Sequence, residues 1–133
     1  MALQQKEFSA LPLRPDPGAS FSEGNPWYAI APGIWEYLLN GSAASGTKVI
    51  VQWFEPGAKT PTNDIITHDY IEEVIFIEGG LKDLTLDHRE WGAGAYAYRL
   101  PGMPHGPYQA TDRGCLMFVR CVPKAKDEET GTH

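Results

Sequence analysis

Short apolar segments separated by turn residues run through most of the chain, and they have the lengths typical of β-strands. The segments predicted as strands are residues 35–39, 48–54, 73–77, 81–86, 95–100 and 115–122. Between them lie NGSAASG, EPG, GG and DHRE, which are typical of turns and hairpin loops. No segment of ten or more residues combines a helical period with a capping residue. Short, closely spaced strands without helices predict an all-β antiparallel sandwich or barrel.

Length and composition favour one domain with extended ends. The chain has 133 residues, of which 14 are glycine and 11 are proline, as expected for short strands joined by tight turns. We predict an extended N-terminal arm over residues 1–26, a barrel over residues 27–123 and a disordered, charged tail over residues 124–133. The proline-rich arm is expected to lie over a neighbouring surface.

Charge and hydropathy exclude several classes of partner. A formal net charge of −6 would repel DNA or RNA, so we expect no nucleic-acid partner. No apolar run is long enough to cross a bilayer, and the first residues lack the layout of a secretory signal, so we expect a cytoplasmic protein without membrane contact. Cys115 and Cys121 would share one face of a strand about 20 Å apart, too far for a disulfide. They are therefore expected to be reduced core thiols.

Polar side chains stand at the start of an apolar strand in the sequence THDYIEEVIFIEGG. Because side chains alternate across a strand, His68 and Glu72 would point into the barrel, whereas Asp69 and Glu73 would face outward. His105 lies in LPGMPHGP, whose prolines restrict the backbone and therefore hold the ring. Two imidazoles and one carboxylate suit Fe(II), Zn(II) or Mn(II) and leave coordination positions open. We therefore predict His68, Glu72 and His105 as metal ligands.

Each of these features also has an ordinary structural explanation. A single histidine in a β-protein is usually a hydrogen-bonded core or surface residue. Adjacent glutamates at the start of a strand usually form a solvated edge. Only their combination at this spacing favours a metal site.

The same residues carry a resemblance to the cupins. Residues 57–80 resemble the first cupin motif, whose last histidine and whose glutamate fall at His68 and Glu72, and residues 94–108 resemble the second motif, with its Pro-Gly turn and His105. The other matching segments are Trp27, PGI at residues 32–34 and FEPGAKTP at residues 54–61. Over about residues 27–122 the chain resembles single-domain cupins related to the anti-sigma factor ChrR and to acetylacetone dioxygenase. The resemblance implies a cupin-type double-stranded β-helix (jelly-roll) barrel with an extended N-terminal arm.

One position departs from the family pattern. The first motif has another histidine two residues before His68, and Ile66 stands there instead. The sequence TPTNDII also lengthens the spacing from Gly57 by about three residues. Asp64 shares the parity of His68 and is an alternative ligand. Otherwise the metal has three protein ligands and more open positions, or binds weakly, or is absent from a degenerate site.

Aromatic side chains are expected to line the pocket around the metal. The candidates are Tyr70, Phe76, Tyr96, Tyr98 and Tyr108, with Phe76 expected mainly to fill the barrel. Glu72, Tyr70 and Tyr108 are the candidate catalytic residues, and Tyr108, three residues after His105, is expected to contact the ligand set or the substrate. His88 in a polar turn and His133 at the end of the chain are not expected to bind metal.

The resemblance implies an Fe(II)-dependent enzyme that cleaves a carbon–carbon bond of a 1,3-dicarbonyl or hydroxyketone with dioxygen. One alternative is a non-oxidative isomerase, lyase or hydrolase in which the metal is a Lewis acid and Glu72 moves a proton. The other is a ligand-binding or sensing module, although no helical sigma-binding segment adjoins the barrel in this sequence. The expected partner is a small-molecule substrate, and a homodimer is expected through sheet edges or the arm.

Overall fold

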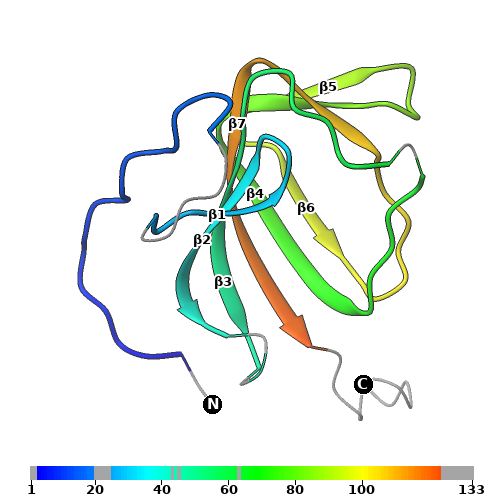
Figure 1. Cartoon of the computed structure of the whole chain (residues 1–133). Helices are drawn as coiled ribbons and strands as arrows, with labels where there is room; N and C mark the ends of the chain where they lie inside the picture. The colour runs from blue at the N-terminus through cyan, green and yellow to red at the C-terminus, as the bar shows by residue number, and fades with distance from the viewer. Residues whose placement is uncertain (1–2, 20–24, 43, 45, 63, 124–133) are drawn as a thin grey trace, which may run out of the picture.

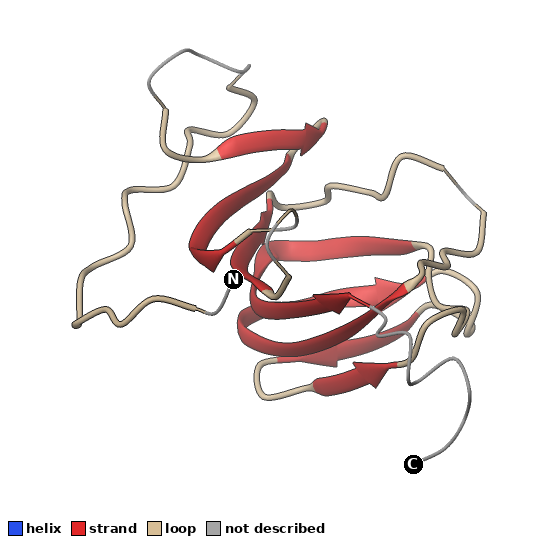
Figure 2. Ribbon diagram, turned by 90° about the horizontal axis from the view of Figure 1, so that it is seen from below, coloured by secondary structure: helices blue, strands red, loops and turns tan. Residues whose placement is uncertain are grey.

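The computed structural model describes residues 3–19, 25–42, 44, 46–62 and 64–123, and every regular element in this part of the chain is a strand. The strands are β1 (Tyr28–Ala31), β2 (Ile34–Gly41), β3 (Lys48–Phe54), β4 (Tyr70–Asp83), β5 (Arg89–Gly92), β6 (Tyr96–Arg99) and β7 (Tyr108–Pro123). They form one antiparallel sheet in the order β1-β2-β3-β7-β4-β5, with β6 paired to the first half of β4 (Figures 1 and 2). The all-β prediction is confirmed. No helix in the described part of the chain is long and apolar enough to cross a membrane.

The two longest strands correct the predicted boundaries. The segments 73–77 and 81–86 are not separate strands, because β4 continues through the GG pair to Asp83. The register between β4 and β7 shifts on both sides of Gly79, so the glycines form a bulge rather than a turn. Gly79 has a φ of 71°, which a glycine adopts without steric cost. Non-local pairing with β7 therefore extends the strand through residues that locally favour a turn.

Three further boundaries differ from the prediction. β1 lies in a stretch that was not predicted as a strand, β5 begins inside the predicted turn at residues 87–90, and β7 starts at residue 108 rather than 115. β1 and β5 are four-residue strands at opposite ends of the sheet, and each pairs with a single neighbour, β1 with β2 and β5 with β4. For strands this short, pairing with the neighbouring strand determines the conformation more than the β-propensity of their own residues does. The chain turn before β5 is made by Asp87 and His88, both with positive φ.

The inward faces of the strands build one core and leave a cavity at its centre. The buried core residues are Ile34, Ile50, Phe54, Val74, Leu81, Ala110, Cys115, Met117 and Val119. Cys115 is buried and Cys121 is half-buried against this core, and both are free thiols, as predicted. Burial raises the pKa of Cys115 to about 12 and that of Cys121 to about 11, which keeps both protonated.

A second apolar cluster lies on the outer face of β2, β3 and β7, where the N-terminal arm covers it. It consists of Trp27, Trp35, Val51, Trp53 and Leu116. The arm runs along this side of the barrel (Figure 1) and makes specific side-chain contacts there. The indole N–H of Trp27 donates to the carbonyl of Pro12, and the guanidinium of Arg14 lies 4.6 Å from the ring centre of Trp53 and pairs with Glu78. The arm thus lies on its own barrel.

Other predictions about the ends and the assembly stay predictions. Residues 1–2, 20–24 and 124–133, which include parts of the predicted arm, the whole predicted tail and His133, lie outside the described residues. The homodimer, the cytoplasmic location and the limits of the three predicted segments are likewise untested.

Candidate metal centre

A cavity of about 560 Å³ opens inside the barrel, and the candidate ligands lie on its wall. Most of its lining is apolar, including Ile34, Phe54, Val74, Leu81, Met117 and Val119. The polar groups His68, Glu72, Arg99 and His105 face the same space. An apolar cavity with a few convergent polar groups is the usual form of a small-molecule site.

Backbone pairing outside the regular strands brings the two histidines together. Ile66 and His105 form an isolated antiparallel bridge, in which the N–H of each donates to the carbonyl of the other at 2.7 and 2.9 Å. The N–H of Gly102 also donates to the carbonyl of His68 at 2.7 Å. The segments before β4 and before β7 therefore close the wall of the barrel side by side. The bridge makes neighbours of His68 and His105, which are 37 positions apart in the sequence.

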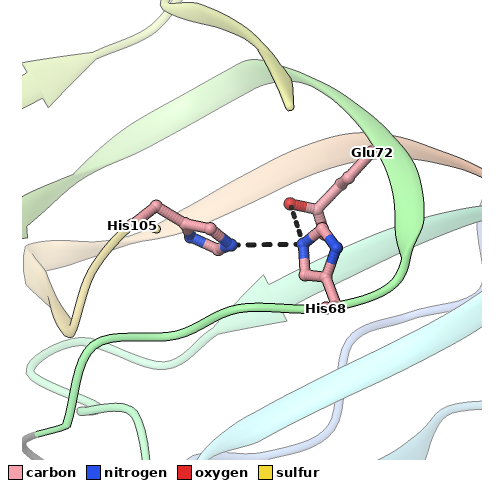
Figure 3. Close-up of side chains that lie close together, drawn as sticks. All are labelled: His68, Glu72 and His105. Carbon is pink, nitrogen blue, oxygen red and sulfur yellow. Dashed lines mark hydrogen bonds and ion pairs between the residues drawn. The ribbon is translucent and has the colours of Figure 1, made fainter. Parts of the chain in front are cut away.

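The three predicted ligands converge (Figure 3). Nε2 of His68 lies 3.2 Å from Nε2 of His105 and 3.5 Å from Oε1 of Glu72. One donor atom from each residue lies within 4.8 Å of the other two, which makes them the group in the described residues that is arranged to hold a metal ion. Glu72 reaches the site from β4, whereas both histidines lie on the connecting segments. Strand alternation therefore explains why Glu72 points inward, whereas the bridge between Ile66 and His105 positions the two histidines.

Hydrogen bonds fix the orientation of both rings. The carbonyl of Tyr70 can only accept, so Nδ1 of His68 donates to it at 3.0 Å, which leaves Nε2 as the nitrogen that can bind a metal in the site. Nδ1 of His105 lies 3.1 Å from the hydroxyl of Tyr108. A metal at Nε2 of His105 requires the ring proton on Nδ1, where the Tyr108 oxygen accepts it. Each histidine therefore has a partner that orients it, as metal-binding histidines do.

Arg99 is a polar residue of the site that the sequence did not predict. It lies opposite Glu72 in the ladder between β6 and β4. Its Nη1 donates to Oε1 of Glu72 at 3.0 Å, and its Nη2 donates to the hydroxyl of Tyr108 at 2.8 Å. The signal in the sequence was the alternation YAYR in β6, in which Arg99 takes the parity of the small residue Ala97. That face of β6 is the one that faces the cavity.

The placement of the aromatic residues corrects part of the prediction. Tyr70 lines the cavity and stacks on His68 with ring centres 4.0 Å apart, and Tyr108 and Phe76 also line it. Phe76 packs against the core as well, as expected. Tyr98 does not line the cavity, because it is on the outward face of β6 and 46% exposed. Tyr96 reaches the cavity wall, but it is 59% exposed and its hydroxyl donates to Glu73 on the outer face.

Ile66 and Asp64 differ in their relation to the site. Ile66 lines the cavity beside the two histidines, so the position that carries a histidine in the first motif does face the ligands. Asp64 is exposed and does not belong to the cluster of ligand atoms in the described residues. Its parity with His68 does not bring it inward, because residues 64–69 are not a regular strand. His88 lies exposed in its turn, away from the cluster.

The pKa of His105 is lowered from 6.5 to about 4, mainly by burial and also by the positive charge of Arg99 and by the neighbouring His68. His105 is therefore neutral at pH 7, the form in which imidazole binds a metal. Burial raises the pKa of Tyr70, and the carboxylate of Glu72 adds to this, so that its phenol stays protonated. Burial likewise raises the pKa of Tyr108.

The lowered pKa of His105 predicts that acid destabilises the metal-free protein. Between pH 6.5 and about 4 the unfolded chain takes up a proton at this residue and the folded chain does not, so the free energy of unfolding falls as the pH falls through this window. Since the ring is only half-buried, we expect a loss of about 2 kcal/mol. Urea unfolding at pH 7 and pH 4.5 measures it. His105→Gln should lose less on acidification than the unchanged protein, and an equal loss in both would contradict the assignment.

The chain is similar to known proteins in its family and in its fold. The model of the ChrR cupin-like domain family matches residues 18–125. No curated protein sequence matches the chain. Among solved structures, an RmlC-like cupin from Shewanella frigidimarina is 20% identical, with 82% of this chain and 93% of that chain covered and a TM-score of 0.59.

Two further similar structures are those of an enzyme and of a protein solved with its partner. An acetylacetone dioxygenase from Acinetobacter johnsonii is 13% identical over 88% of this chain and 80% of that chain, with a TM-score of 0.57. The anti-sigma factor ChrR of Rhodobacter sphaeroides, solved with SigE, is 17% identical over 75% of this chain and 49% of that chain, with a TM-score of 0.54. At these identities the likeness concerns the fold. It confirms the predicted cupin-type jelly-roll barrel.

Proposed function

The chain belongs to the family of ChrR cupin-like domains, and from that premise we propose that it is a metal-dependent enzyme acting on a small molecule. The observation that supports this most is the convergence of two imidazole nitrogens and a carboxylate oxygen on the wall of an apolar cavity. The reaction we propose is the oxygen-dependent cleavage of a carbon–carbon bond in a 1,3-dicarbonyl or hydroxyketone. An acetylacetone dioxygenase is among the structures with the same fold.

The residues present fit a divalent metal ion. His68, Glu72 and His105 would hold it, since two neutral imidazoles and one carboxylate are a donor set for Fe(II), Zn(II) or Mn(II). When bound, the metal supplies Lewis acidity and leaves positions for two oxygen atoms of a substrate and for a second reactant. Fe(II) is the metal expected for the oxygen-dependent reaction, since two histidines and one carboxylate are the donor set typical of non-haem Fe(II) oxygenases.

The protein residues around the donors would bind and orient the substrate. The apolar walls exclude water from the reacting atoms, which strengthens electrostatic contacts inside the cavity. Tyr70 covers one face of His68 and keeps its ring in place. The hydroxyl of Tyr108 contacts both His105 and Arg99, so that it can position a substrate oxygen next to the donors. Glu72, whose carboxylate accepts a hydrogen bond from Arg99, is the candidate base that would take the proton from the carbon between the two carbonyl groups of the substrate and leave the enolate.

A sensing module is the second candidate, and Ile66 is the observation that favours it. With an isoleucine beside the two histidines, the site has three donors and binds metal less tightly than a four-donor site would. A cavity of this kind can hold a ligand without catalysis, and the anti-sigma factor ChrR shares the fold. The non-oxidative alternative uses the same residues and differs only in needing no dioxygen.

Metal content and oxygen consumption together test the proposal. We expect protein purified without added metal to contain a transition metal bound by one site per chain, measured by elemental analysis. With Fe(II), we expect oxygen uptake with at least one member of a panel of 1,3-diketones and hydroxyketones. In the expected reaction the bond between the central carbon and one carbonyl carbon breaks, and one diketone and one dioxygen yield a carboxylic acid and a 2-oxoaldehyde, which balances atoms and electrons.

The outcomes separate the three functions. Substrate loss without oxygen uptake would contradict the dioxygenase and support an isomerase, lyase or hydrolase. Stoichiometric binding of panel compounds without any turnover would support the sensing module. Absence of any bound metal, even after incubation with Fe(II) or Zn(II), would contradict a metal-dependent enzyme of either kind.

A further inference from the structure

Arg99 and Tyr108 form a polar pair on the cavity wall beside the three candidate ligands, and we propose that this pair binds a carboxylate of the substrate. The substrate is then a 1,3-dicarbonyl compound that also carries an acid group, of the 2,4-dioxo acid class. The inference rests on the proposed function for the 1,3-dicarbonyl part. The acid group follows from the geometry of Arg99 and Tyr108 and from the charges around them.

The geometry of Arg99 suits recognition of an anion. Its side chain is only 15% exposed, and both terminal nitrogens face the centre of the site, one toward Glu72 and one toward the Tyr108 hydroxyl. A guanidinium has five N–H donors in a planar fork, and the structure assigns it two hydrogen bonds. The remaining donors and the hydroxyl of Tyr108 can receive the two oxygens of a carboxylate.

The charges of the cavity favour an anionic ligand once a divalent metal is bound. In the described lining, Glu72 and Asp83 are the acidic groups and Arg99 is the basic one. Asp83 is buried, and its Oδ1 is bonded to the backbone N–H and the hydroxyl of Thr85, so it serves the turn after β4. A carboxylate of Glu72 that binds a divalent cation no longer neutralises Arg99. The cavity then holds a net positive charge in apolar surroundings, which an anionic substrate offsets.

The other arginine on this part of the sheet provides a contrast and a control. Arg120 lies on β7 and points to the outer face, where its Nε and Nη2 both donate to Oε1 of Glu73, at 3.1 and 2.9 Å. Glu73 is not a candidate ligand, so this pair persists whether or not metal binds. Arg99, in contrast, shares its carboxylate with the metal site. Only the inner arginine is therefore available for a ligand.

The rest of the cavity favours a substrate with an apolar body. Beyond the polar pair the walls are formed by side chains such as Ile34, Val74 and Met117. A volume of about 560 Å³ accommodates a compact ligand with one charged end. A long polar ligand, such as a sugar phosphate, would leave its hydroxyl groups unpaired against these walls.

The matched probes are 2,4-dioxopentanoate and its methyl ester, which share the 1,3-dicarbonyl and differ in the charge. Binding is measured by calorimetry on the full chain loaded with Zn(II), which prevents oxidation, and on the metal-free chain. We expect the acid to bind on the order of ten- to a hundredfold more tightly than the ester, as for hydrogen bonds to a charged group. Arg99→Gln should abolish this preference, and Arg120→Gln should leave it unchanged. Arg99→Lys, which keeps the charge but loses the fork, should retain part of it.

Three outcomes would overturn the inference: equal binding of acid and ester by the unchanged protein, retention of the full preference in Arg99→Gln, or loss of it in Arg120→Gln. If Arg99→Gln also lowers the thermal midpoint, the preference of Arg99→Lys for the acid over the ester gives a second, independent test of the role of the guanidinium. Failure of the proposed function is distinguishable. Oxygen uptake with neutral diketones that does not depend on Arg99 would support the enzyme and contradict the acid group. Arg99-dependent preference for the acid in a chain that binds no metal would support the anion site and contradict the metal-dependent enzyme.

Discussion

Replacing His105 with alanine is expected to lower the affinity for Zn(II) or Fe(II) by more than about 100-fold, since loss of a residue that only orients a ligand already costs about 10- to 100-fold. The substitution removes one of three donor atoms that lie within 4.8 Å of one another, and two donors rarely retain a divalent ion in water. His68→Ala should have an effect of the same order. Competition with a chelator of known affinity, followed by elemental analysis of the protein fraction, measures the change.

Two further variants show whether the loss is specific to the site. His88→Asn removes a histidine from the exposed turn before β5, at a positive φ that asparagine tolerates, and should retain the metal. Tyr108→Phe keeps all three donors but removes the hydroxyl beside Nδ1 of His105, and should weaken binding by about 10-fold. Full metal content in His105→Ala would show that His105 is not a ligand.

The sequence predicted the three candidate ligands because their chemistry is visible without the fold. The alternation of side chains before residue 73 placed His68 and Glu72 on one face, and the proline-rich segment LPGMPHGP, which also resembles the second cupin motif, singled out His105. The structure brings the three together, although their role as ligands stays a prediction. The reason for their proximity was not visible, since the bridge between Ile66 and His105 joins two irregular segments. Parity failed at Asp64 for the same reason.

The features that the sequence could not predict depend on which strands are neighbours. Whether the aromatic or the small face of β6 points inward is decided by its pairing with β4, which places Arg99 beside Glu72 and leaves Tyr98 outside. Local alternation of small and aromatic residues is compatible with either orientation. The continuity of β4 through its GG pair is likewise decided by β7. Register and strand order are therefore the information that one sequence lacks.

Replacing Gly79 with alanine is expected to destabilise the protein by more than about 3 kcal/mol, a large part of the stability of a typical domain. A Cβ at this position would lie 1.9 Å from the carbonyl oxygen of Gly114 and 2.7 Å from its carbon, and both are backbone atoms that cannot rotate away. The positive φ of 71° adds about 1–2 kcal/mol for any L-residue. Since Gly79 is the bulge that keeps β4 paired to β7 along its whole length, the clash should disrupt the two longest strands of the fold.

Gly94→Ala is the matched control, because Gly94 also has a positive φ, of 86°, but a Cβ there would meet nothing within 4 Å. Its free energy of unfolding should fall only by the cost of the positive φ, about 1 kcal/mol. Urea unfolding of the two variants therefore separates steric overlap from conformational strain. Equal losses would mean that the close approach of β4 and β7 at the bulge does not constrain the fold. A selective loss in Gly79→Ala should also weaken metal binding, because the candidate ligand Glu72 lies on the same strand and the bulge helps to hold that strand in register with β7.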